Sequence, residues 1–209
     1  MWVKICGMTN REDALAAVEA GADAVGFILV SSSARAVTRH EVEEMLRALP
    51  PTVLTVGVVA NEDPDFLRGL VRVCPFGALQ LHGQETPEEA FRLKEELSGV
   101  QIIKAVRVRD AESLKEIPKY RGVDAVLLDT YDPHKLGGTG TPFDWSLAVQ
   151  AQEYGIPLIV AGGLTAGNVA EVVRQVQPHG VDVSSGVEVS PGKKDFTRIR
   201  EFVLKAKRG

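Results

Sequence analysis

The chain of 209 residues is short of cysteine, and this shortage excludes two kinds of site. Its two cysteines, Cys6 and Cys74, lie far apart and belong to no paired spacing. Structural zinc sites and disulfide frameworks need several closely spaced cysteines. We therefore expect no metal site, and a reduced, cytoplasmic protein in which Cys74 has a structural role.

Basic charge and long apolar runs are also scarce. The net charge of −4 leaves no excess of lysine and arginine for a phosphate backbone, which argues against a nucleic-acid partner. No apolar run approaches the roughly 20 residues that span a bilayer, and the sequence does not begin with a basic stretch followed by an apolar segment. We therefore predict neither a membrane partner nor a secretory signal.

Short apolar runs alternate with helical patterns along the whole chain. The predicted strands are Val3–Cys6, Ala24–Leu29, Val53–Val59, Ala78–Leu81, Ile102–Ala105, Ala125–Leu128, Leu158–Val160 and Val181–Ser184. The predicted helices are Arg11–Ala20, Arg39–Leu49, Pro64–Val73, Pro87–Leu97, Ala111–Ile117, Asp144–Tyr154, Ala166–Gln175 and Asp195–Lys207. Eight strand–helix units in a chain of this length predict an α/β protein with a closed (β/α)8 TIM barrel.

We find no long linker or low-complexity tract, so we expect one barrel domain over residues 1–209. The alternative architecture is a doubly wound open sheet. Its dinucleotide-binding form has a glycine-rich turn after the first strand, whereas here a single Gly7 follows that strand. The closed barrel is therefore favoured.

In a (β/α)8 barrel the carboxyl ends of the strands form the active-site face. The residues that follow the predicted strands would therefore converge on one pocket. The candidates are Cys6, Ser31–Arg35, Asn61, Gln80, His82, Asp129, Gly162, Gly163, Ser184, Ser185 and Gly186. Chance polarity of loops could explain any one of them, but it explains the whole set poorly.

The loops after the last two predicted strands indicate a phosphorylated ligand. Gly162 and Gly163 follow the seventh strand, and Ser184, Ser185 and Gly186 follow the eighth. Barrels commonly bind phosphate between these two loops, where small residues let backbone N–H groups approach the anion. Loop glycines alone would be weak evidence, because many serve only tight turns.

A family resemblance rests on a series of motifs rather than on one. In chain order these are Lys4-Ile5-Cys6-Gly7-Met8-Thr9, Leu79-Gln80-Leu81-His82-Gly83, Leu127-Leu128-Asp129, Gly137-Gly138-Thr139-Gly140, Phe143-Asp144-Trp145, Ala161-Gly162-Gly163-Leu164, Val181–Glu188 and Pro191-Gly192-Lys193-Lys194-Asp195. In this order and spacing, nearly the whole chain resembles the phosphoribosylanthranilate isomerases of tryptophan biosynthesis. The resemblance implies a cofactor-independent Amadori rearrangement of N-(5-phosphoribosyl)anthranilate.

The resemblance also implies a general base and a general acid. Cys6 matches the family's base and Asp129 its acid, so Asp129 must carry a proton at neutral pH to act. An isolated cysteine at a strand end is more often a small buried hydrophobe. Lys4 points to the same side of the strand as Cys6, and we expect it to favour the thiolate, with Asp182 positioning its ammonium. A purely structural Lys4–Asp182 ion pair is an equal alternative.

The remaining matches concern substrate binding. Arg35 matches the arginine that binds the anthranilate carboxylate, although Ala34 stands where the family usually has proline, which leaves the loop less constrained. Gln80 and His82 share one strand face and are expected to line the pocket, with a core histidine as the alternative. Asn61 is expected only to support the site.

The long segment 130–142 has the length and glycine content of an active-site cover. We expect it to close over the phosphorylated sugar–anthranilate substrate, in a protein that is a monomer or a homodimer. Two other functions remain as alternatives at this stage. One is another sugar-phosphate barrel enzyme, such as a pentose-phosphate epimerase or an indole-glycerol-phosphate synthase. The other is a sugar-phosphate sensor without catalysis.

Overall fold

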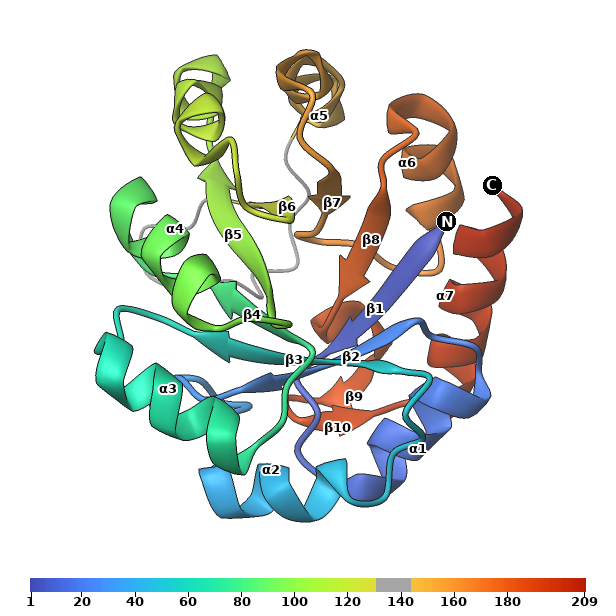
Figure 1. Ribbon diagram of the computed structural model, residues 1–209. Helices are drawn as coiled ribbons and strands as arrows, with labels where there is room; N and C mark the ends of the chain where they lie inside the picture. Colours follow the sequence, from blue (N-terminus) through green and yellow to red (C-terminus); the bar gives the residue numbers. More distant parts are fainter. Residues whose placement is uncertain (131–143) are drawn as a thin grey trace.

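The computed structural model describes residues 1–130 and 144–209 and contains a closed barrel of parallel strands surrounded by helices (Figure 1). The barrel strands are β1 (Trp2–Cys6), β2 (Ala24–Ile28), β3 (Leu54–Val59), β4 (Ala78–Leu81), β5 (Gln101–Val108), β6 (Ala125–Thr130), β7 (Leu158–Val160) and β8 (Gly180–Val183). They pair in sequence order, and β8 closes the ring on β1, with Lys4 beside Asp182. The predicted (β/α)8 barrel is confirmed, whereas its description as one domain stays a prediction.

The helices follow the strands in the expected alternation. They are α1 (Arg11–Glu19), α2 (Arg39–Leu46), α3 (Pro64–Val73), α4 (Pro87–Glu96), the 3-10 helix η1 (Ala111–Tyr120), α5 (Trp145–Ala151) with η2 (Gln152–Tyr154), α6 (Val169–Val176) and α7 (Phe196–Arg208). Thr38 and Thr86 begin α2 and α4 with capping boxes, in which a threonine and a glutamate bond each other's backbone N–H. No helix in the described part of the chain is both long and apolar enough to cross a membrane.

The bounds of several elements differ from the sequence-based expectation, as at the end of α2 and the start of α6, and two differences have a clear cause. The fifth helix is a 3-10 helix, and it contains Pro118, which cannot donate the backbone hydrogen bond of an α-helix. Strand β5 extends to Val108 instead of ending at Ala105. The charged Arg107 interrupts the apolar pattern there, and this is why the strand was predicted too short.

A second small sheet follows β8. The short 3-10 helix η3 (Ser185–Val187) leads into β9 (Glu188–Ser190), which pairs antiparallel with β10 (Lys193–Lys194). This hairpin lies close to α1, because the backbone N–H of Lys194 donates to the buried carboxylate of Asp13. It therefore connects the last strand of the barrel to the helix that follows the first strand.

The alternation of side chains along each strand divides the core in two. One apolar cluster fills the space between the strands and the helices. A smaller cluster fills the barrel interior with short side chains such as Ala78, Ala105 and Ala125. On β1, β4 and β8 the interior positions above this cluster are polar, with Lys4, Gln80 and Asp182 all buried. The interior thus changes from apolar to polar toward the carboxyl ends of the strands.

Candidate active site

A pocket of about 590 Å³ opens at the carboxyl ends of the barrel strands. The predicted site residues that line it are Cys6, Arg35, Gln80, His82, Asp129, Gly162, Gly163, Asp182, Ser184 and Ser185. These residues come from six of the eight barrel strands or the loops after them and meet in one cavity, as the barrel geometry predicts. Lys4, Gly186 and Asn61 do not line the pocket.

Cys6 sits at the end of β1 with its side chain directed into the barrel and Lys4 beneath it. The Lys4 ammonium is fully buried and donates to Asp182 Oδ1 at 3.0 Å and to Gln80 Oε1 at 2.9 Å. Gly26 on β2 makes room for both side chains, since a Cβ there would lie 2.7 Å from Cys6 Sγ. The predicted Lys4–Asp182 pair is therefore present.

Burial raises the pKa of the Cys6 thiol above its ordinary value, and Asp182 adds to the effect. Lys4 and Lys194 act in the opposite direction, as expected of nearby cations, but they do not outweigh burial. The pKa of Lys4 would be lowered by its own burial, yet Asp182 and Cys6 raise it overall. Lys4 therefore stays a cation and favours the thiolate, within a site that otherwise favours the thiol.

Asp129 is buried at the end of β6 and accepts a hydrogen bond from the backbone N–H of Thr130 at 2.9 Å. Its second oxygen lies 3.4 Å from His82 Nε2. His82 Nδ1 in turn lies 2.9 Å from Gln80 Nε2. A chain of polar contacts thus runs from the cation beside Cys6 to the carboxylate of Asp129.

The direction of these contacts fixes the orientation of the imidazole. The Lys4 ammonium can only donate, so the amide oxygen of Gln80 faces it and the amide nitrogen faces His82. His82 Nδ1 must then accept, and its hydrogen lies on Nε2, toward Asp129. Gln80 and His82 are therefore pocket residues that link Lys4 to Asp129 by polar contacts, although His82 Nε2 makes no hydrogen bond among the described residues.

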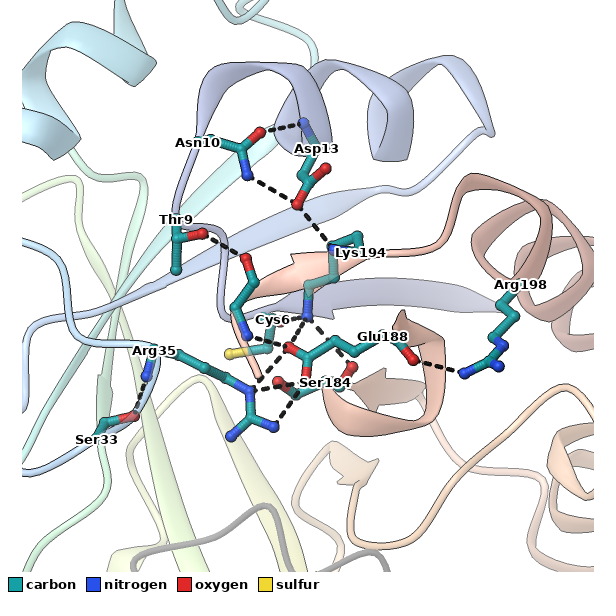
Figure 2. A network of polar contacts seen from close by, with 11 residues as sticks. Cys6, Thr9, Asn10, Asp13, Ser33, Arg35, Ser184, Glu188, Lys194 and Arg198 are labelled. Carbon is teal, nitrogen blue, oxygen red and sulfur yellow. Dashed lines mark hydrogen bonds and ion pairs between the residues drawn. The ribbon is translucent and has the colours of Figure 1, made fainter. Parts of the chain in front are cut away.

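Arg35 lies in the loop after β2, and Glu188 from β9 holds its guanidinium (Figure 2). Arg35 Nε donates to Glu188 Oε1 at 2.8 Å, and Arg35 Nη2 donates to Glu188 Oε2 at 2.7 Å. This hydrogen-bonded pair raises the pKa of Arg35, although the burial of Arg35 opposes it. Lys194 contacts the same carboxylate from the other side, with Nζ 2.8 Å from Oε1.

The loops after β7 and β8 lie against each other at the pocket wall. Gly162 and Gly163 both have left-handed backbone conformations, with φ of 77° and 65°. A side chain at Gly186 would overlap the backbone carbonyl of Leu164 in the neighbouring loop. Ser184 Oγ is buried and has no hydrogen-bond partner among the described residues. These loops supply the small, polar surface that was predicted to bind phosphate.

Three residues around the site were not predicted as site residues from the sequence. Arg107 lines the pocket from β5, and it was missed because that strand was expected to end two residues earlier. Glu188 and Lys194 were noted only as members of motifs. Asn61 was expected to support the site, and it bonds the loop after β4 through the backbone N–H of Gln84. The predicted cover, 130–142, lies outside the described residues except for Thr130.

Comparisons with known proteins agree with this geometry. A sequence model of the family described as N-(5'phosphoribosyl)anthranilate (PRA) isomerase matches residues 3–205. An N-(5'-phosphoribosyl)anthranilate isomerase from Geobacter sulfurreducens is 48% identical over 205 residues, which cover 98% of each chain. The crystal structure of phosphoribosyl anthranilate isomerase from Thermotoga maritima has a TM-score of 0.93 and 40% identity, with full coverage of both chains.

A further crystal structure shows phosphoribosyl anthranilate isomerase in complex with reduced 1-(o-carboxyphenylamino)-1-deoxyribulose 5-phosphate. It has a TM-score of 0.90 and 39% identity over the full length of both chains. Relatives that match from end to end with this fold place the chain among the (β/α)8-barrel isomerases. More narrowly, it belongs to the N-(5'-phosphoribosyl)anthranilate isomerase family.

Proposed function

We propose that the chain rearranges N-(5-phosphoribosyl)anthranilate to 1-(2-carboxyphenylamino)-1-deoxyribulose 5-phosphate in this pocket, with Cys6 as general base and Asp129 as general acid. The observation that carries the assignment is the position of the two groups. They end β1 and β6, which β7 and β8 separate in the ring, and both line one cavity. A sugar bound between them would meet the thiol on one side and the carboxyl group on the other.

The reaction needs one proton delivered and one removed. Asp129, carrying a proton, protonates the furanose ring oxygen, and the ring opens to an imine. Cys6, as the thiolate, removes the proton from C2′ to give an enolamine, which tautomerises to the ketone. The substrate is oxidised at C2′ and reduced at C1′, so the two changes balance within one molecule and the chemistry calls for no external oxidant.

The two ends of the substrate differ in the group that recognises them. We assign the phosphate to the loops that contain Gly162, Gly163, Ser184, Ser185 and Gly186. We assign the anthranilate carboxylate to Arg35, since a guanidinium binds a carboxylate through paired hydrogen bonds. The pocket's polar ends and its apolar wall from Ile28, Val58 and Ala161 fit a substrate with an aromatic ring between two anionic groups.

The isomerase assay with Cys6→Ala and Asp129→Ala tests these roles. Each substitution removes one proton-transfer group, so each should lower kcat by about 10²- to 10⁴-fold while leaving the binding of the reduced product analogue within a few-fold. Cys74→Ala is the matched control, because this second buried thiol lies at the end of α3, away from the pocket. Full activity in either site variant would remove that residue from the mechanism.

The same assay separates the alternative functions. A sugar-phosphate sensor would bind the analogue without turnover in the wild-type chain, and an epimerase or synthase would convert a different substrate. We also propose a cytoplasmic location, which the biosynthetic reaction supports. Whether the protein is a monomer or a homodimer is a separate expectation, to be measured by sedimentation.

A further inference from the structure

Glu188 occupies one edge of the Arg35 guanidinium, and the other edge has no hydrogen-bond partner among residues 1–130 and 144–209. Glu188 receives hydrogen bonds from Nε and from one side of Nη2. The N–H groups of Nη1 and the second N–H of Nη2 remain at the end of the group. Arg35 lines the pocket, and its side chain is 13% exposed against 4% for Glu188. The free end is thus the part that a bound carboxylate can reach.

The aliphatic stem of the Arg35 side chain is confined as tightly as its guanidinium head. Gly7, at the end of the first motif, has a φ of 79°, and a Cβ at this position would lie 2.7 Å from Arg35 Cδ. The arginine stem therefore rests against the Gly7 backbone. With the stem placed by Gly7 and the head bonded by Glu188, the guanidinium keeps one orientation before any ligand binds.

Glu188 is itself held by Lys194 of β10, which also bonds the backbone at the ends of β1 and β8 (Figure 2). Lys194 Nζ donates to Glu188 Oε1 at 2.8 Å, to the carbonyl oxygen of Cys6 at 2.6 Å and to that of Ser184 at 3.2 Å. The side chain of Lys194 is fully buried. One ammonium thus connects the carboxylate that orients Arg35 with the backbone of the candidate base and of the phosphate loop.

While Cys6 carries its proton, the charges of this cluster do not balance. Two cations, Arg35 and Lys194, share the single carboxylate of Glu188. The nearby Asp13 does not supply the missing charge, because Lys193 lies 3.5 Å from its second oxygen. Buried charge is costly unless it is paired. An anion at the free end of Arg35 would complete the cluster.

We propose that Glu188 is a positioning residue: together with Lys194 it presents the free end of Arg35 to the substrate carboxylate and thereby sets the preference of the pocket for an anthranilate over an unsubstituted aniline. This inference rests on the proposed binding role of Arg35 and adds the residues that enforce it. It also explains how Arg35 can be fixed although Ala34, rather than proline, precedes it.

Binding of two probes tests the proposal. One is the reduced product analogue, reduced 1-(2-carboxyphenylamino)-1-deoxyribulose 5-phosphate, and the other is its counterpart without the ring carboxylate. The ratio of their dissociation constants measures carboxylate recognition alone. We expect wild type to prefer the carboxylate probe by about 10- to 100-fold, the range of charge-assisted hydrogen bonds, and Arg35→Met to lose that preference.

Two variants of Glu188 should reduce the ratio through Arg35. Glu188→Asp keeps the charge but shortens the side chain, and Glu188→Gln keeps the length but removes the charge. Both should lower the preference about tenfold, with binding of the carboxylate-free probe changed less than about threefold. Adding Glu188→Gln to Arg35→Met should cause no further loss of preference. Glu171→Gln, on the exposed face of α6, is the control.

Each other outcome overturns a defined part of this account. If wild type shows no preference, Arg35 does not read a carboxylate, and its proposed role fails together with this inference. If Arg35→Met loses the preference but both Glu188 variants keep it, only the positioning role fails. If the Glu188 variants weaken both probes equally, or neither variant folds by circular dichroism, Glu188 serves the structure rather than recognition.

Discussion

Two opposing influences meet at Cys6. Burial favours the neutral thiol, whereas a general base must be a thiolate, and Lys4 is the neighbour that most favours the charged form. Gly26 allows the two side chains to lie together inside the barrel. The cost of burying the lysine is offset by Asp182 and by the amide oxygen of Gln80. The balance between the thiol and thiolate forms of Cys6 is therefore set by its neighbours rather than by exposure to solvent.

Lys4→Met should raise the pKa of Cys6 further. The substitution removes the cation that lowers this pKa and leaves burial and Asp182, which raise it. Because the base acts as the thiolate, the rise of kcat/KM with pH should move to higher pH. At neutral pH the activity falls about tenfold for each unit of the shift. The rate of thiol alkylation against pH, in a Cys74→Ser background, measures the shift directly. An unchanged alkylation profile would leave Lys4 with the structural ion pair alone.

Individual residues were predictable from the sequence where a strand end or a motif marked them. Cys6, Asp129 and the glycines of the seventh loop are examples. Glu188 and Arg107 were not marked in this way. Glu188 functions through Arg35, which is 153 positions away in the sequence. No local sequence pattern predicts such a distant partner. Arg107 lies in a strand whose alternation its own charge interrupts.

At the scale of elements, the site depends on the close approach of two loops. The loop after β7 and the helix η3 after β8 touch where Gly186 faces the carbonyl of Leu164. The sequence predicted both loops and their small residues, because glycine and serine clusters follow apolar runs. It could not predict this contact, which depends on how the barrel closes and brings β7 beside β8.

Gly186→Ala should separate these loops and weaken phosphate binding. Its Cβ would overlap backbone atoms, which cannot rotate away as a side chain can. We expect KM to rise about 10- to 100-fold, the equivalent of one or two lost hydrogen bonds to a charged group, with a smaller change in kcat. The inhibition constant of inorganic phosphate should rise in parallel.

Gly69→Ala is the matched control for this substitution. Gly69 lies in α3, and an added Cβ there would meet open space. The change should leave KM unaltered and stabilise the protein by about 0.5–1 kcal/mol through helix propensity. If Gly186→Ala binds phosphate as tightly as wild type, the two loops do not form the phosphate site.

At the scale of the whole molecule, one buried ion pair spans the seam where the barrel closes. Lys4 on the first strand and Asp182 on the last are neighbours in the register of β1 and β8, and their charged atoms lie 3.0 Å apart. The alternation of strands and helices was enough to predict a barrel. The pairing across its seam was inferred from the alternation of side chains along the first strand and from strand order, and its position inside the polar layer appears only in three dimensions.

Asp182→Asn should destabilise the closed barrel by about 3–5 kcal/mol, the cost of leaving one member of a buried pair uncompensated. Lys4→Met in the same chain should recover part of this loss, because it removes the unpaired cation.

The pKa of Lys4 is raised in the folded protein, so the contribution of the pair is fully present below the lysine pKa of the unfolded chain, about 10.4. The contribution of the pair is lost as the pH rises through the pKa of Lys4 in the folded protein. On the alkaline side, the gap between wild type and Asp182→Asn in urea unfolding should therefore be constant near neutrality and narrow in strong alkali. Glu116→Gln, which breaks an exposed pair with Lys119, should leave the unfolding free energy unchanged. Strict additivity of the two seam substitutions would mean that the pair is not coupled across the closure, and that the barrel is held there by its backbone ladder alone.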